Sequence, residues 1–125
     1  SRRSIERSEL ARLTQVDYER ELAFIATHSL PTGEETLAVA RAVIDPDNVD
    51  AEFGIVVRSD LKGGGLGVVL MKKLIRHLRE HGTQRLVATV LAENTRMLEL
   101  ARDLGFVAAP LAPGDDTVSI ALPLA

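Results

Sequence analysis

The chain of 125 residues contains no cysteine and no tryptophan, and only 3% of its residues are aromatic. The absence of cysteine excludes disulfides, thiolate zinc sites and a cysteine nucleophile. The net charge of −3 argues against nucleic acid or an acidic lipid surface as a partner. The sequence also has no apolar run of about 18 to 20 residues, the length of a membrane span, and no apolar stretch of signal-peptide type. These absences favour a cytoplasmic protein that binds neither nucleic acid nor membrane.

The residues that are present predict one domain with an aliphatic core. Hydrophobic residues make up 46% of the chain and charged residues 26%, a balance typical of a globular domain of this length. No internal repeat or linker divides residues 1–125, so we expect a single domain. Because the chain begins with Ser1 rather than methionine, we expect it to be excised from a longer protein.

The hydrophobic pattern predicts short strands around two amphipathic helices. We expect a brief helix over residues 8–16 and a hairpin of strands over 21–28 and 36–44, joined through Pro31 and Gly33. A strand over 51–58, a helix over 67–81 and a strand over 85–91 come next. A helix over 94–104 and strands over 106–111 and 117–122 end the chain. The strand–helix–strand order predicts a parallel pair with a right-handed crossover. The expected fold class is therefore α/β, with a mixed, mainly antiparallel sheet that contains one parallel pair.

A cluster of glycines joins the third expected strand to the long helix. Gly63, Gly64, Gly65 and Gly67 leave backbone N–H groups unobstructed at a helix N-terminus, which is the chemistry of a phosphate cradle. No Lys-Ser or Lys-Thr follows, so the P-loop pattern fails, and the spacing does not fit the dinucleotide-binding pattern. A flexible strand-to-helix connection is the alternative interpretation.

These glycines belong to a wider pattern that resembles a known family. A strand that ends in Val-Val-Arg, a glycine loop before an apolar helix, and an asparagine that opens a second helix ending in Leu-Gly-Phe resemble the GNAT superfamily of acyl-CoA N-acyltransferases. Over about residues 8–123 the sequence is similar to the acetyltransferase domain of Pat-type bacterial protein lysine acetyltransferases. Lys62 stands where the family usually has Gln or Arg. The family's first strand and first helix have no room before Ser8, so we expect both to be missing from this chain, and the sheet edge left by that loss makes pairing with a second copy conceivable.

The resemblance implies acetyl-CoA as cosubstrate, with no metal. It implies that the backbone of Val56 and Val57 pairs with the pantetheine arm, and that the amides from Gly63 to Gly67 hold the pyrophosphate. Gly54 independently suits a place where another backbone approaches closely, although a β-bulge there is an alternative. Asn94 is expected to cap its helix, and the resemblance adds a contact with the arm. The residues expected to bind acetyl-CoA are Val56, Val57, Lys62, Gly63, Gly64, Gly65, Leu66, Gly67 and Asn94.

Glu52 is the residue that we predict to act as general base. A lysine ammonium, with an unperturbed pKa of about 10.4, must lose a proton before its nitrogen attacks a thioester. Glu52 shares its strand face with Gly54 and Val56, and the resemblance implies a glutamate on this strand in protein lysine acetyltransferases. We expect the amide near Val56 to polarise the thioester carbonyl. A solvated carboxylate at the strand end is the alternative interpretation.

The remaining polar residues receive weaker assignments. The tyrosine that many GNAT enzymes use as general acid is replaced by Ala101, and we expect Tyr18 to belong to a substrate wall or to the core. Arg58 and Lys62 are expected either to contact phosphate oxygens or to be solvated. His77 and His81 are one helical turn apart, but without a third ligand they predict no metal site.

The expected function is direct transfer of an acetyl group from acetyl-CoA to a primary amine, in particular the ε-amine of a protein lysine. The resemblance implies protein substrates that include acyl-CoA synthetases. Two alternatives stay open. One is a small-molecule amine N-acetyltransferase, and the other is a non-catalytic domain that senses acyl-CoA.

Overall fold

Seven strands form one sheet in the order β1-β2-β3-β4-β5-β7-β6 in the computed structural model, which describes residues 12–110 and 112–125. Every neighbouring pair is antiparallel except β4 and β5, which are parallel. The expected mixed α/β fold with one parallel pair is therefore confirmed. The strands are β1 (Arg12–Asp17), β2 (Glu21–Leu30), β3 (Gly33–Ile44), β4 (Asp50–Val57), β5 (Arg85–Leu91), β6 (Val107–Ala108) and β7 (Thr117–Pro123).

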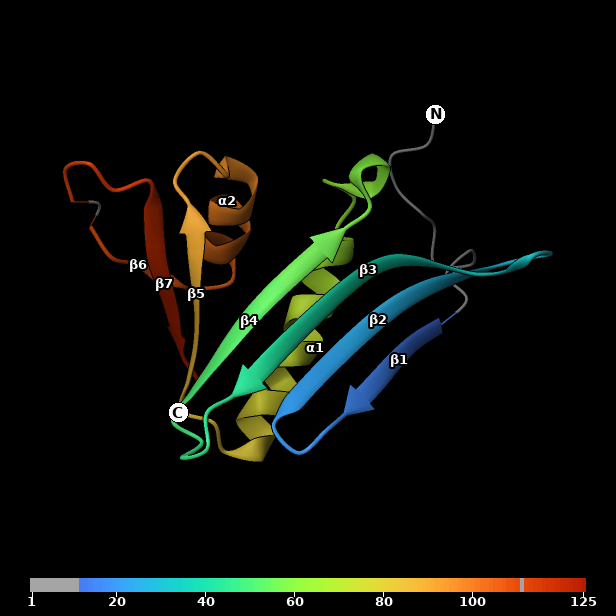
Figure 1. Cartoon of the computed structure of the whole chain (residues 1–125), viewed down its shortest axis with the longest axis horizontal. Helices are drawn as coiled ribbons and strands as arrows, with labels where there is room; N and C mark the ends of the chain where they lie inside the picture. The colour runs from blue at the N-terminus through green and yellow to red at the C-terminus, as the bar shows by residue number, and fades with distance from the viewer. Residues whose placement is uncertain (1–11, 111) are drawn as a thin grey trace.

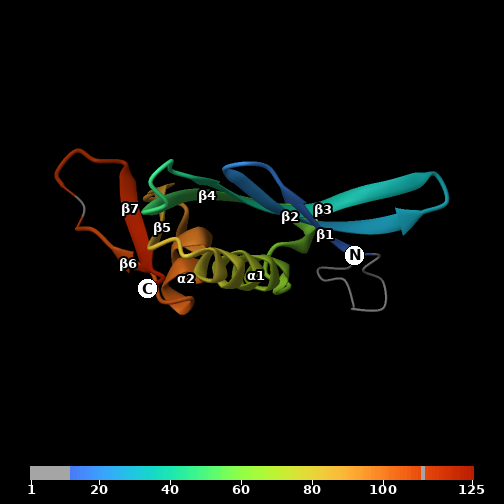
Figure 2. The ribbon, with the colours of Figure 1, turned by 90° about the horizontal axis from the view of Figure 1, so that it is seen from below.

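Two helices cover one face of this sheet. Helix α1 (Leu66–His81) connects β4 to β5, and α2 (Thr95–Asp103) follows β5, so the predicted parallel pair joined by a helix is confirmed. Both helices lie on the same side of the sheet (Figure 2). Neither helix in the described part of the chain is long and apolar enough to cross a membrane. We call the opposite side, which these helices leave uncovered, the open face.

The core lies between α1 and the centre of the sheet. Leu70, Met71 and Leu74 on α1 are fully buried, and so are Ala40 and Ala42 on the strand beneath them. Alanines at these positions let the helix approach the sheet closely, because a small side chain leaves room for the long side chains of the helix. The period of 3.6 residues on α1 and of 2 on the strands predicts this arrangement.

The face alternation of β4 is the feature of the fold that matters most for the site. Phe53, Ile55 and Val57 point toward the helices, whereas Glu52 and Val56 lie on the open face and are exposed. Val56 leaves 72% of its surface exposed. An apolar residue so exposed has little role in the core, and no described residue covers this part of the open face.

The start of the chain differs from the expected helix over residues 8–16. Residues 12–16 belong to strand β1, which pairs with β2 so that Thr14 lies opposite Ile25 and Val16 opposite Ala23. Residues 8–11 lie outside those that the structure describes. Leu13 and Val16 suit a helical stripe, but β-branched Thr14 and Val16 also suit a strand, and pairing with β2 decides between the two.

The penultimate strand is shorter than the expected range of 106–111. Strand β6 contains only Val107 and Ala108, and Phe106 before it is buried with 7% of its surface exposed. Pro110 carries no N–H and so does not extend the ladder as a donor. Residue 111 lies outside the described part of the chain.

Candidate functional site

Strands β4 and β5 form a fork. They pair only through Asp50–Glu52 and Arg85–Val87, and beyond this point the two strands diverge (Figure 1). Arg85 donates two hydrogen bonds of 2.8 Å to the carboxylate of Asp50 at the base of the fork. The hydrogen bond from Arg85 lowers the pKa of Asp50. Glu52 stands at the last paired position, so its exposed carboxylate lies where the fork opens.

The backbone groups of β4 alternate between its two neighbours. The N–H of Arg58 donates to the carbonyl of Leu37 on β3 at 2.8 Å, and the register with β3 is continuous along the strand. The backbone groups of Val56 therefore face β3, and those of Ile55 and Val57 face the open side of the fork. The expected amide near Val56 is therefore that of Ile55 or Val57, and the expectation is corrected only for the backbone of Val56 itself. The side-chain pattern does not indicate which neighbour a backbone group faces, because that depends on the register.

Gly54 lies within regular pairing. It stands opposite Arg41 without a register shift, so the alternative of a β-bulge at Gly54 is wrong. A Cβ atom on Gly54 would meet nothing within 4 Å. No group of the described residues therefore fills the space directly above Gly54 on the open face, beside Glu52.

The glycine loop continues directly from β4. A 3₁₀ turn, η2 (Ser59–Leu61), follows Arg58, and Leu61 fixes the turn to the core with 3% of its surface exposed. Gly63 and Gly65 both have a φ of +87°, a left-handed conformation that disfavours any residue with a Cβ atom. This requirement explains two of the four glycines by backbone geometry alone.

The loop presents several backbone donors. Gly65 is the N-cap of α1 without a side-chain cap, and no acceptor among the described residues meets the N–H groups of Gly65, Leu66 and Gly67. Gly64 is an exception, because its N–H donates to the carbonyl of Leu61 at 3.2 Å. The expectation that all amides from Gly63 to Gly67 face a ligand is therefore corrected at Gly64. The free donors and the positive end of the helix dipole suit an anion.

Comparison with known proteins identifies the fold that holds this fork and loop. The model of the acetyltransferase (GNAT) family matches residues 2–106. This chain belongs to the acetyltransferase (GNAT) family. Membership supports acetyl-CoA-dependent N-acetyltransferase activity in general terms, since that is the activity that names the family. The resemblance inferred from the glycine loop is thereby confirmed.

Two solved structures and one curated relative are similar to this chain, and the matched region is only part of each of those proteins. A cAMP-binding acyltransferase from Mycobacterium smegmatis has a TM-score of 0.71 and 30% identity over 88% of this chain and 33% of that one. The GNAT domain of S. lividans PAT has the same fold, with a TM-score of 0.70 and 22% identity over 95% of this chain and 69% of that one. The L-methionine sulfoximine/L-methionine sulfone acetyltransferase of Pseudomonas aeruginosa is 40% identical over 55 residues, 44% of this chain and 32% of that enzyme. The match therefore spans about a third of the length of that curated relative.

Arg58 is paired with two carboxylates at the start of the loop. Its Nε and Nη2 atoms donate to the carboxylate of Asp60 at 2.6 and 3.0 Å, and its Nη1 atom donates to Glu35. The hydrogen bond to Asp60 raises the pKa of Arg58. With two carboxylates around one guanidinium, Arg58 braces the start of the loop rather than adding a cation to it.

Two other cations flank the loop. Lys62 follows the 3₁₀ turn and is exposed, without an ion pair to a described residue. Arg96, in the first turn of α2, places its Nη1 atom 3.2 Å from the position that a Cβ atom on Gly63 would occupy. Sequence reasoning missed Arg96, because one arginine on a polar helix face carries no signal of its own.

Asn94 has the capping role that the sequence predicts. Its Oδ1 atom accepts a hydrogen bond of 3.2 Å from the N–H of Met97. The Nδ2 group of the same exposed side chain has no partner among the described residues. This leaves a donor on Asn94 at the end of β5, on the far side of the fork from β4.

The other candidate polar residues lie apart from the fork. Tyr18 is 70% exposed in the turn between β1 and β2, so its placement in the core is wrong. His77 lies against Phe24, with ring centroids 6.2 Å apart in an edge-to-face arrangement. Among the described residues no group of three His, Cys, Asp or Glu side chains has metal-binding geometry. Ala101 is buried with 2% of its surface exposed and offers no acid.

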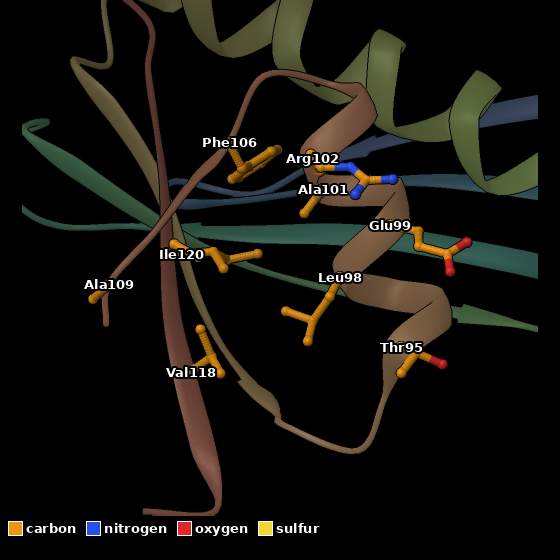
Figure 3. Close-up of a pocket in the computed structure, with 10 residues that line it drawn as sticks. Thr95, Leu98, Glu99, Ala101, Arg102, Phe106, Ala109, Val118 and Ile120 are labelled. Carbon is orange, nitrogen blue, oxygen red and sulfur yellow. The ribbon is translucent and has the colours of Figure 1, made fainter. Parts of the chain in front are cut away.

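A hollow lies between α2 and strand β7, and it is separate from the fork. It has a volume of about 530 Å³ and apolar walls that include Leu98, Phe106, Val118 and Ile120. Leu98 and Ile120 point toward one another there (Figure 3). None of the residues expected to bind acetyl-CoA lines this hollow, so it is distinct from the candidate site.

Proposed function

We propose that this GNAT domain transfers the acetyl group of acetyl-CoA directly to a primary amine, and that the amine is the ε-amino group of a protein lysine. The observation that carries the proposal is the open edge of β4, which runs from Glu52 at the base of the fork to the glycine loop at its end. The edge offers a ladder of backbone groups, the loop offers anion donors, and Glu52 offers a proton acceptor.

Acetyl-CoA has the shape that this edge requires. Its pantetheine arm contains two amide groups, so it pairs with a strand edge as another strand does. From Phe53 to Val57 the strand advances roughly 13 Å, at about 3.3 Å per residue. An extended arm has about this length, because its two amide units correspond to about four residues of backbone. With the diphosphate at the loop, the thioester then lies near Gly54, within reach of Glu52.

The transfer itself needs one proton acceptor and one oxyanion donor. Glu52 takes a proton from the ammonium group, the freed amine nitrogen attacks the thioester carbonyl carbon, and the C–S bond breaks as the amide forms. A backbone N–H on the open edge of β4 stabilises the negative charge on the carbonyl oxygen. The CoA thiolate leaves and takes the second proton of the attacking nitrogen, so the products are the neutral amide and CoA thiol. Since a thiol of this kind has a pKa of about 8.5, departure without a dedicated acid is tolerable.

The open face favours a protein as acceptor. Val43 and Val56 on this face are 48% and 72% exposed. Glu52 is on the same strand as Val56 and lies opposite Val43 of β3, without a covering helix among the described residues. A protein surface that carries a lysine reaches such a flat site. We include an acyl-CoA synthetase among the candidate substrates, because the sequence resembles Pat-type acetyltransferases.

A small-molecule amine is the second candidate acceptor. The curated relative with 40% identity over 55 residues acetylates L-methionine sulfoximine and L-methionine sulfone. A domain that binds acyl-CoA without turnover is the third. Assays with polyamines, these amino acids and a protein substrate separate the three functions.

Turnover is measured by release of free CoA with a thiol reagent. The chain contains no cysteine, so the reagent reports CoA alone when the acceptor lacks a free thiol. We expect Glu52→Gln to keep its affinity for acetyl-CoA and to lower turnover about 100-fold or more. Glu99→Gln on α2 is the control for loss of a carboxylate elsewhere. Unchanged turnover in Glu52→Gln excludes Glu52 as the base.

A further inference from the structure

Arg96 differs from most arginines of the described chain because no carboxylate neutralises it. Arg41, Arg58, Arg85 and Arg102 each form an ion pair with a carboxylate. Arg96 is exposed and has no such partner among the described residues, yet its guanidinium lies against the loop at Gly63. An arginine beside free backbone donors, without an ion pair to a described residue, has its charge and its planar donors available for an anion.

Arg96 approaches the glycine loop from the other side of the fork. The glycine loop follows β4 on one side of the fork, and Arg96 belongs to the first turn of α2, which follows β5 on the other side. The start of α1 also packs against α2, because a Cβ atom on Gly67 would lie 3.6 Å from Leu100 Cδ2 of α2. Arg96 therefore adds a cation from the second wall to the backbone donors of the first.

We infer that Arg96 binds the diphosphate of the acyl-CoA ligand from α2, beside the glycine loop. The inference rests on the proposed function and adds a residue to it. The planar guanidinium donates two parallel hydrogen bonds to phosphate oxygens, while the N–H groups of Gly65, Leu66 and Gly67 donate to other phosphate oxygens. Arg58 does not take this role, because three of its five N–H groups donate to Asp60 and Glu35 and these two carboxylates offset its charge.

Titration calorimetry on the full chain tests this inference with CoA and 3′-dephospho-CoA as ligands. We expect Arg96→Ala to weaken both ligands about 10- to 100-fold, the loss typical of a hydrogen bond to a charged group. Arg96→Lys should recover only part of the affinity, because lysine lacks the planar fork. Arg102→Ala, in the same helix but on the side that lines the hollow between α2 and β7, should bind as the unaltered chain does.

The two ligands separate the possible phosphate contacts. Both carry the diphosphate, so an equal loss for both supports the inference, and a loss for CoA alone assigns Arg96 to the 3′-phosphate and overturns it. Equal affinity of Arg96→Ala and the unaltered chain also overturns it, while the proposed function stands. If the unaltered chain binds neither ligand, the proposed function fails together with this inference. Thermal unfolding of each variant verifies that exposed Arg96 is not needed for folding.

Discussion

Arg58 and Asp60 form a bidentate pair at the point where β4 leaves the sheet, with Nε–Oδ1 and Nη2–Oδ2 distances of 2.6 and 3.0 Å. The pair closes across the start of the 3₁₀ turn, so it fixes the direction in which the glycine loop begins. It also offsets the charge of Arg58, the arginine that precedes the loop in the sequence. The cations that flank the loop are therefore Lys62 and Arg96.

The Arg58–Asp60 pair predicts a pH-dependent contribution to stability. The hydrogen bond from Arg58 lowers the pKa of Asp60 from its ordinary value of 3.8. The folded carboxylate therefore contributes stability above pH 3.8 that is lost as the pH falls through its lowered folded pKa. We expect Asp60→Asn to be less stable than the unaltered chain at pH 6, and the difference to disappear in strong acid.

Urea unfolding at a series of pH values measures this difference. Asp103→Asn is the matched control, because Asp103 is exposed and its nearest contact with Arg102 is 4.0 Å. A difference between Asp60→Asn and the unaltered chain that persists unchanged down to pH 2 contradicts the prediction.

Replacement by alanine should lower folding stability at Gly65 but not at Gly67. Gly65 has a φ of +87°, so alanine there costs about 1–2 kcal/mol of folding stability. Gly67 is helical, and a Cβ atom on it would make ordinary contacts of 3.5 to 3.8 Å with Ile55, Leu100 and Val57. Alanine at Gly67 should leave stability equal or raise it by up to about 1 kcal/mol. Thermal unfolding checks both variants, and a larger loss at Gly67 than at Gly65 contradicts the assignment.

Asn48 should be worth more to stability than its exposed turn suggests. Its Oδ1 atom accepts a 2.7 Å hydrogen bond from the hydroxyl of Thr83, its Nδ2 atom donates to the carbonyl of His81 at 3.2 Å, and its φ is 58°. Thr83 is only 2% exposed. Asn48→Ala leaves that hydroxyl without an acceptor and should cost about 1–3 kcal/mol, with about 1 kcal/mol more for the left-handed backbone.

Two companion variants separate these contributions by urea unfolding. Asn48→Gly removes the hydrogen bonds but relieves the backbone, so it should be more stable than Asn48→Ala. In Thr83→Val no hydroxyl is left unpaired, so a subsequent Asn48→Ala change should cost less than it does in the unaltered chain. Equal costs in both backgrounds mean that the Thr83–Asn48 contact does not stabilise the fold.

Gly54 should tolerate a larger side chain in the fold but not in the reaction. A Cβ atom there meets nothing within 4 Å, and valine favours strands, so Gly54→Val should unfold at the same temperature as the unaltered chain or higher. Its side chain would occupy the open face next to Glu52, where the proposed acceptor approaches. We expect a raised KM for the amine, measured by CoA release, and an unchanged KM contradicts approach from this face.

The sequence by itself predicts what depends on neighbours along the chain. The 3.6-residue period gives both helices, Gly82 ends α1 with a φ of 86°, and Asn94 caps α2 through Met97. The hairpin of β2 and β3 and the parallel pair follow from turn residues and element order. The glycine loop indicates the family from sequence alone. Its left-handed backbone at Gly63 and Gly65 requires glycine, so the conformation is visible in the composition.

Only the tertiary structure decides what depends on partners far along the chain. Pairing with β2 makes residues 12–16 a strand, although their apolar spacing also suits a helix. The register with β3 turns the amides of Ile55 and Val57, rather than that of Val56, toward the fork. The pairing of Arg58 with Glu35, 23 residues earlier in the chain, is likewise a product of the fold, whereas Arg96 forms no ion pair with a described residue. Each outcome is set by which groups meet in space, because a backbone group or a charge acts only through the partner that it reaches.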